Sequence, residues 1–156
     1  MLSQDINRKL ELLREQKKRI RFNRIDQYDP YPYQQKFHDT GKDSNQRLLM
    51  AANRIGKSYS GAAEMSYHLR GIYPEWWKGR RYDQPITAWA GGVSNETTRD
   101  IVQAELLGSP DDPDAFGSGA IPKNYIIKTE RKPGVPNAKS VALIRHVSGG
   151  NSSLHF

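Results

Sequence analysis

Residues 48–71, LLMAANRIGKSYSGAAEMSYHLRG, constrain the fold more than any other part of this sequence. An apolar run of strand length leads into a short loop that ends Gly56-Lys57-Ser58. A segment rich in small residues follows, and it stops at Gly71 shortly before Pro74, as helices commonly do. The order predicts a buried strand over RLLMAA, a tight turn, and a helix over 57–70.

The loop departs from the phosphate-binding pattern G-x-x-x-x-G-K-[ST] at one position, where Ala51 replaces the first glycine. A small side chain fits there if the backbone dihedrals stay negative, so the substitution weakens the pattern without destroying it. Backbone N–H groups of such a turn, together with the positive end of the following helix, favour phosphate oxygens. We therefore expect a phosphate cradle.

Each loop residue has an expected role. Gly56 lets the main chain approach a phosphate closely, Lys57 places an ammonium against the β and γ phosphates, and Ser58 offers its hydroxyl to Mg²⁺. Arg54 is unusual inside such a loop; it is either a surface cation or a cis arginine that neutralises phosphate charge, which makes it a catalytic candidate with Lys57. The nucleotide-binding candidates in the loop are Ala51, Ala52, Asn53, Arg54, Ile55, Gly56, Lys57 and Ser58.

The remaining segments predict the rest of the fold. PITAWAGG is typical of a second strand, Asn95 is expected to cap a helix that runs to about Leu107, and VALIRHV and SSLHF look like two strands joined by a Gly-rich turn. The alternation of strands and helices predicts a mainly parallel α/β sheet with flanking helices.

The amino-terminal segment is strongly basic. Residues 1–25 hold eight Lys/Arg and three Asp/Glu, so they carry +5 of the net charge of +7. Leu2, Ile6, Leu10, Leu13 and Ile20 recur at helical spacing, which predicts a helix over 2–22. Two interpretations stay open: a solvated helix whose apolar stripe packs on a neighbour, or a basic arm that contacts DNA phosphates or a partner protein. We divide the chain into this arm, 1–25, and a partial domain, 26–156.

Composition narrows the class of protein. The sequence contains no cysteine, which excludes disulfides and thiolate metal sites. It has no signal-peptide pattern and no apolar run near the roughly 20 residues of a membrane helix. We expect a soluble, intracellular protein without membrane contact.

The loop AANRIGKS resembles the variant Walker A motif of large terminase subunits, the motors that package DNA in tailed bacteriophages. The upstream DPYPYQQKFHDTG resembles the adenine-binding segment of that family, with Gln34 as the reader of the adenine edge, Gln35 as the fallback, and Tyr33 or Phe37 beside the base. The alternative is a surface glutamine on a short helix. PITAWAGGVSNETTRDIVQAELL resembles the next strand-loop-helix, so the resemblance covers about residues 28–108.

This resemblance implies a P-loop NTPase-type fold, with ATP and Mg²⁺ as cofactors. It implies a motor that hydrolyses ATP and packages double-stranded viral DNA into proheads in the host cytoplasm. The implied partners are the DNA, a small terminase subunit and a portal protein, and the full-length family members are expected to form a homo-oligomeric ring.

An acidic strand that completes an ATPase site is missing, as are clustered nuclease carboxylates. The acidic cluster SPDDPD, residues 109–114, follows no apolar strand, and we interpret it as a solvated loop. We therefore expect an amino-terminal part of a large terminase subunit that does not turn over ATP well, with Leu48 and Met50 exposed along an unpaired strand. Two rival interpretations are a helicase-like P-loop ATPase and a non-catalytic remnant or binding module.

Overall fold

The computed structural model describes residues 2–156, and side chains from residue 5 onward. The helices are α1 (Leu2–Phe22), α2 (Pro32–Asp39), α3 (Lys57–Arg70), α4 (Asn95–Thr97) and α5 (Ala104–Leu107). The strands are β1 (Thr87–Trp89), β2 (Ile126–Arg131), β3 (Lys139–Arg145) and β4 (Asn151–His155). Short 3-10 turns are η1 (Arg24–Gln27), η2 (Thr40–Lys42), η4 (Pro113–Ala115) and η5 (Lys123–Tyr125), and η3 (Thr98–Gln103) is a π-helical segment between α4 and α5.

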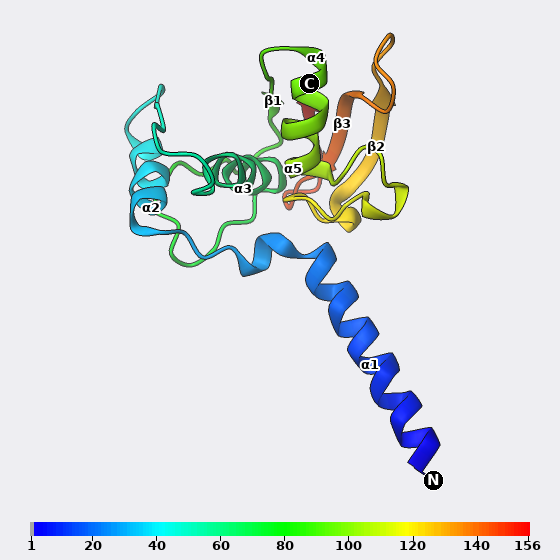
Figure 1. Ribbon diagram of the computed structural model, residues 1–156. Coiled ribbons are helices and arrows are strands. Elements are labelled where there is room, and N and C mark those ends of the chain that lie inside the picture. Colours follow the sequence, from blue (N-terminus) through cyan, green and yellow to red (C-terminus); the bar gives the residue numbers. More distant parts are fainter. Residues whose placement is uncertain (1) are drawn as a thin grey trace.

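The four strands form one sheet in the order β1-β4-β3-β2 (Figure 1). Only β1 and β4 run parallel, and the other two pairs are antiparallel. The fold is therefore mixed α/β, but the prediction of a mainly parallel sheet is wrong. The reason is local: short connections join β2 to β3 and β3 to β4, and strands joined by short turns must run antiparallel.

The predicted buried strand over RLLMAA is also absent. Residues 46–52 belong to no helix or strand, and Leu48 and Met50 are 80% and 81% exposed. An apolar run forms a buried strand only when neighbouring strands satisfy its backbone groups, and no strand of the described chain lies beside this one. The expected exposure of Leu48 and Met50 is confirmed.

The helix predictions agree more closely with the structure. The helix after the loop begins at Lys57 and ends at Arg70, with Gly71 in the left-handed conformation as its C-cap. The expected helix near 95–107 exists as α4, η3 and α5 in succession. Its N-cap is Ser94 rather than Asn95, because the Ser94 hydroxyl accepts a hydrogen bond from the Thr97 N–H at 3.1 Å.

Helices α3 and α5 pack on the sheet and form the main core. The fully buried members of that core include Leu69 from α3, Leu107 from α5, Ile144 from β3 and Leu154 from β4. A second cluster lies on the other side of α3, where Ala63 and Tyr67 meet Ile25 and Trp77. Helix α3 is thus buried along two faces, and its first turn carries the Gly56-Lys57-Ser58 loop.

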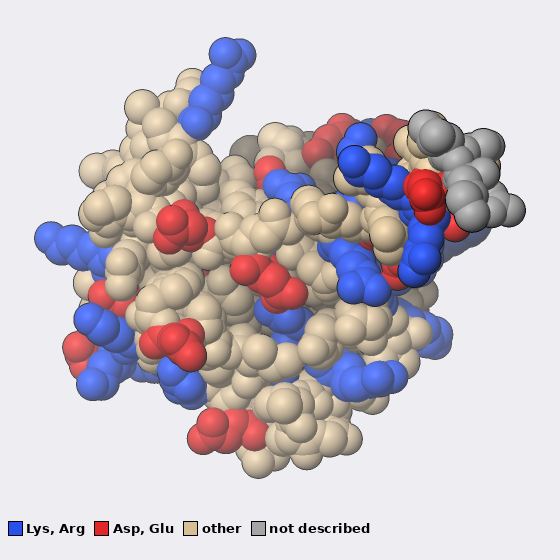
Figure 2. All heavy atoms as spheres, turned by 90° about the horizontal axis from the view of Figure 1, so that it is seen from below, with Lys and Arg blue, Asp and Glu red and all other residues tan. Residues whose placement is uncertain are grey.

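Helix α1 projects away from this body (Figure 1). Its apolar stripe is not packed on the rest of the chain, since Ile6, Leu10, Leu13 and Ile20 are all exposed. Figure 2 shows Lys and Arg side chains around this projecting helix. Of the described helices, none is long and apolar enough to cross a bilayer.

We expect Leu69→Ala to lower the free energy of unfolding by about 2–5 kcal/mol, because it leaves a cavity where α3 meets the sheet. Leu48→Ala is the matched control: the same atoms are removed from an exposed side chain, so the loss should stay below about 0.5 kcal/mol. Urea unfolding of both variants measures the difference. Equal losses would contradict this placement of the core.

Candidate functional site

Two residues of the loop before α3 have the left-handed backbone conformation. Gly56, the N-cap residue of α3, has φ of 82°, and a Cβ added there would lie 2.9 Å from the Gln34 amide nitrogen. Arg54 has φ of 63°, which is uncommon for a residue with a side chain and is typical of strained functional loops. The backbone therefore requires glycine at position 56, as the phosphate-loop pattern predicts.

The side chain of Lys57 lies against its own loop. Its ammonium donates hydrogen bonds to the Ala51 carbonyl at 2.7 Å and to the Ala52 carbonyl at 2.5 Å. These carbonyls solvate the charge, because their negative ends point at it. The sequence-predicted residues Ala51, Ala52 and Lys57 are thus in contact, although Ala51 and Ala52 meet the lysine through carbonyl oxygens rather than through N–H groups.

The amino terminus of α3 has features that suit an anion. Gly56 provides no side chain to cap the helix, and among the described residues no other side chain does so. The first N–H groups of a helix lack intrahelical partners, and the helix dipole places partial positive charge there. A phosphate group fits this chemistry, and Asn53, Arg54 and Gly56 are exposed beside it, with Ile55 half-buried.

Ser58 is the candidate metal ligand, and it is exposed in the first turn of α3. It lines a cavity of about 370 Å³ with Met65 from α3 and Trp89 from β1. Within the described residues, no three His, Asp or Glu side chains gather where they could hold a metal ion. A hydroxyl suits Mg²⁺, and Glu105 is the carboxylate in the lining of the same cavity.

Gln34 joins α2 to the loop. Its amide oxygen accepts from the Tyr31 N–H at 2.8 Å, and its amide nitrogen lies 3.3 Å from the Gly56 carbonyl and 3.4 Å from the Ile55 carbonyl. The side chain is only 3% exposed. Both ends of the amide therefore have partners within the chain, so reading an adenine edge would require Gln34 to exchange them.

The other adenine-segment candidates are separated. The Tyr33 hydroxyl donates to the Ile55 carbonyl, and its ring stacks on Tyr31 with centroids 6.0 Å apart. Phe37 lies instead under the Arg47 guanidinium, 4.6 Å from the ring centroid. Gln35 is half-buried. The structure thus brings Gln34 and Tyr33 to the loop and leaves Phe37 elsewhere.

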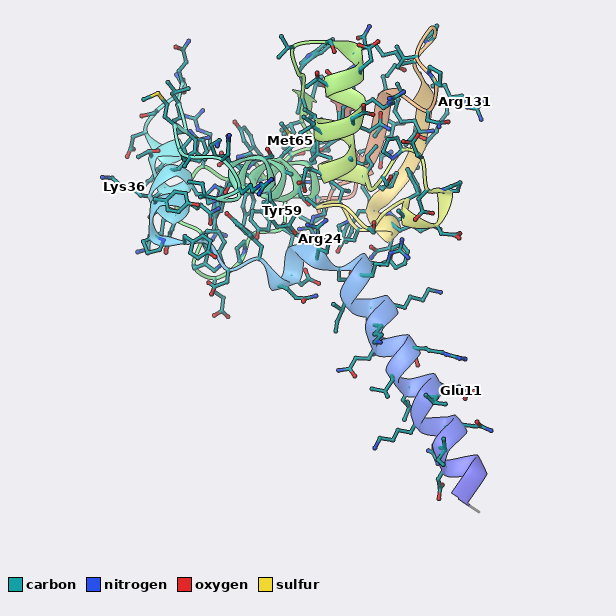
Figure 3. The ribbon with its side chains drawn as sticks, viewed as in Figure 1. Glu11, Arg24, Lys36, Tyr59, Met65 and Arg131 are labelled. Atoms are coloured by element: carbon teal, nitrogen blue, oxygen red, sulfur yellow. The ribbon has the colours of Figure 1, made fainter. Side chains whose placement is uncertain are left out.

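A cavity of about 580 Å³ opens beside Gly56 and Gln34. Aromatic rings of Tyr28, Tyr31 and Tyr59 line it, and Arg24 lies 4.7 Å from the Tyr59 ring (Figure 3). Sequence reasoning did not single out these tyrosines or Arg24. The cluster DQYDPYPY was a signal for part of the cavity, since three tyrosines in a linker need somewhere to pack.

A buried charged cluster lies behind the loop. Glu64 of α3 contacts Arg47, His38 Nδ1 at 2.7 Å and His68 Nε2 at 3.4 Å. Burial alone would raise the pKa of the Glu64 carboxyl, but hydrogen bonds from His38, His68 and Arg47 outweigh it and hold the pKa below its ordinary value. Glu64 is therefore ionised and ties α2 and the segment before the loop to α3.

The acidic segment 109–114 is tied into its own part of the surface. Asp112 pairs with Arg21 at 3.2 Å and also accepts from the Asp114 N–H at 2.9 Å, while Asp111 accepts from Asn137 at 3.3 Å. None of these carboxylates lines the cavities beside Gly56 or Ser58. The segment behaves as a structured loop with exposed acids.

The fold and the loop together define a mixed α/β protein with a lysine-bearing glycine loop at an uncapped helix terminus. The chain is 37% identical over 149 residues to the terminase large subunit of Salmonella phage P22, a match that covers 88% of this chain. This confirms the relationship to terminase large subunits. The chain spans 30% of the length of that relative. No family model matches the chain, and no solved structure matches it.

We expect Glu64→Gln to lower the free energy of unfolding by about 3 kcal/mol at pH 7, because it leaves half-buried Arg47 and buried His38 facing a neutral amide. The pKa of Glu64 is lower in the folded state than in the unfolded state, so its contribution is present above roughly pH 5 and is lost as the pH falls below about 4. The difference between wild type and variant should therefore shrink in acid.

Urea unfolding at pH 7, 5 and 3.5 measures this difference. Glu75→Gln serves as the control, because Glu75 is exposed and lies outside the charged cluster. A Glu64→Gln penalty that stayed constant down to pH 3.5 would show that the carboxylate charge is not what stabilises the cluster.

Proposed function

We propose that this chain forms the nucleotide-binding part of a phage DNA-packaging motor, and that it binds ATP with Mg²⁺ through residues 51–58. The proposal rests on the relationship to a terminase large subunit together with one structural observation. That observation is the uncapped start of α3, where a left-handed Gly56 is followed by Lys57 and Ser58. In the motor, ATP hydrolysis would drive double-stranded viral DNA into a prohead in the host cytoplasm.

The loop residues have separable roles in this proposal. Lys57 exchanges the Ala51 and Ala52 carbonyls for phosphate oxygens, which are stronger acceptors for an ammonium. The N–H groups at the start of α3 bind the same anion, and Ser58 contributes a hydroxyl to the Mg²⁺ shell. Arg54, exposed within the loop, would neutralise charge that develops on the phosphates. Bound Mg²⁺ would polarise the phosphoryl oxygens.

The cavity beside Gly56 is the proposed place for the base. Its three tyrosine rings offer flat apolar surface, and Gln34 stands at its edge next to the loop. Gln34 would select adenine only by releasing the Tyr31 N–H or the loop carbonyls. Such an exchange would couple base binding to the phosphate loop, because Gln34 contacts the Ile55 and Gly56 carbonyls.

The larger assembly is also a proposal. We propose that the full-length protein works as a homo-oligomeric ring with a small terminase subunit and a portal protein, and that acidic residues outside 1–156 complete its ATPase site. The cavity beside Gly56 has a single carboxylate in its lining, Asp29, and the cavity beside Ser58 also has one, Glu105. Because neither cavity holds the pair of acidic side chains that this reaction needs, this chain alone should bind ATP but hydrolyse it slowly.

We expect Lys57→Ala to weaken the binding of ATP with Mg²⁺ at least tenfold, because a charge-assisted hydrogen bond contributes about 1.5–3 kcal/mol. Isothermal titration calorimetry of the 156-residue chain measures the affinity. The control is Lys42→Ala, which removes an exposed lysine from η2. ATP binding that is unchanged in Lys57→Ala would refute the assignment of the loop.

The basic arm α1 generates a separate prediction about DNA. We expect neutralisation of four exposed α1 cations to make the slope of log affinity against log salt shallower by up to about 3–4 units, since each phosphate contact contributes about 0.9. The variant replaces with Gln the residues Arg8, Lys9, Arg14 and Lys17. A matched variant replaces four exposed lysines on the body: Lys36, Lys42, Lys78 and Lys128.

Fluorescence anisotropy with a labelled duplex, repeated over a range of salt concentrations, gives both slopes. If the two variants changed the slope equally, α1 would have no special role in DNA binding. If neither changed it, the exposed apolar stripe of α1 would point to a protein partner instead.

A further inference from the structure

A chain of hydrogen bonds runs from the buried charge of Glu64 to the glycine of the loop. The Glu64 carboxylate lies 2.7 Å from His38 Nδ1, and His38 Nε2 lies 3.1 Å from the Tyr28 hydroxyl. The Tyr28 hydroxyl lies 3.2 Å from Ser60 Oγ, which donates to the Gly56 carbonyl at 2.9 Å. His38 and Ser60 are fully buried, so water does not compete for these groups.

The last link of this chain bears on the phosphate loop. The Gly56 carbonyl and the Lys57 N–H belong to one peptide group, and that group is planar. Fixing the direction of the carbonyl therefore fixes the direction of the N–H, which points the opposite way at the start of α3. Ser60 also donates its backbone N–H to the same carbonyl at 2.9 Å, and the Gln34 amide nitrogen lies 3.3 Å from it, so the Ser60 hydroxyl is one of three restraints.

The protons of this chain of hydrogen bonds can be arranged in two ways. Because the ionised Glu64 can only accept, His38 Nδ1 carries a proton. If Nε2 is also protonated, it donates to the Tyr28 oxygen, Tyr28 donates to Ser60, and the single Ser60 hydroxyl proton must go to Gly56. If Nε2 is bare, Tyr28 donates to His38 instead, and its oxygen becomes a competing acceptor for the Ser60 proton.

We propose that Tyr28 and His38 are positioning residues for the phosphate loop. In this proposal, the protonation state of His38 decides whether the Ser60 hydroxyl donates only to the Gly56 carbonyl. The role assigned to the loop rests on the nucleotide-binding function proposed above. Protonated His38 holds the Gly56–Lys57 peptide in the orientation that presents its N–H to an anion such as a nucleotide phosphate. Neutral His38 loosens that restraint.

The groups that face His38 are compatible with such a switch. Helix α3 presents Glu64, with His68 on the carboxylate's other oxygen, and the segment before the loop presents Arg47. The segment after η1 presents Tyr28, whose pKa burial raises above its ordinary value, so its hydroxyl keeps its proton. Residues 72–82 contribute the rings of Trp76 and Trp77, which carry no charge.

The first test observes the loop without nucleotide. In chain labelled with ¹⁵N-lysine, the Lys57 amide signal is identified by its loss in Lys57→Ala. We expect that signal to change with pH in the wild type, and to lose this pH dependence in Tyr28→Phe and in His38→Gln. Tyr67→Phe is the matched control, because its ring belongs to the same aromatic cluster but its hydroxyl lies outside the chain of hydrogen bonds.

His68→Gln addresses the second histidine on Glu64, and it should keep the pH dependence. A Lys57 signal that responds to pH in Tyr28→Phe as it does in Tyr67→Phe would overturn the proposal. Loss of the response in His68→Gln but not in His38→Gln would also overturn it.

The second test measures ATP affinity with Mg²⁺ at pH 6 and pH 8. Tyr28→Phe should bind about fivefold to tenfold more weakly than Tyr67→Phe at pH 6, with a smaller ratio at pH 8. Ionisation of the nucleotide affects both variants equally and cancels in the ratio. If the wild type binds ATP but Tyr28→Phe and Tyr67→Phe bind it equally well at both pH values, this inference is overturned and the proposed function is not. A wild type that binds no ATP would refute the proposed function, and the lysine amide signal would then decide the inference.

Discussion

The ionised carboxylate of Glu64 is the contact on which the arrangement around the loop depends. A buried charge is tolerated only where hydrogen bonds replace its lost hydration, and here the donors come from three separate parts of the chain. Arg47 fixes the segment that leads into the loop, His38 fixes α2, and His68 shares α3 with Glu64. Glu64 therefore sets where the loop begins and where α2 lies relative to it.

This arrangement gives the loop two independent supports. Gln34 reaches the Ile55 and Gly56 carbonyls from α2, and Ser60 reaches the Gly56 carbonyl from within α3. Lys57 meanwhile satisfies its charge on the Ala51 and Ala52 carbonyls. The loop is thus held in shape by its surroundings, which lowers the ordering cost of binding an anion.

The sequence predicted the local elements well because their signals are local. Gly56 and Gly71 mark the ends of α3, and the Gly-rich turn marks the β3–β4 hairpin. The parallel sheet and the strand over RLLMAA were wrong because they depend on neighbours: a strand needs a partner, and Leu48 and Met50 have none among the described strands. Strand β2 was missed, since IIKTER alternates apolar and polar residues too weakly to stand out.

The same distinction applies to the site. Lys57 and Ser58 could be selected from spacing and Gln34 from the family resemblance, whereas Glu64 looks like an ordinary helix acid until α2 and Arg47 are placed against it. Tyr28 illustrates the point further, because a tyrosine in a proline-rich linker gives no sign that its hydroxyl will lie between His38 and Ser60. The residues proposed to bind a ligand belong to a motif, while the residues that hold this motif in place are found only through the packing. That is why the support of this loop, rather than the loop itself, required the structure.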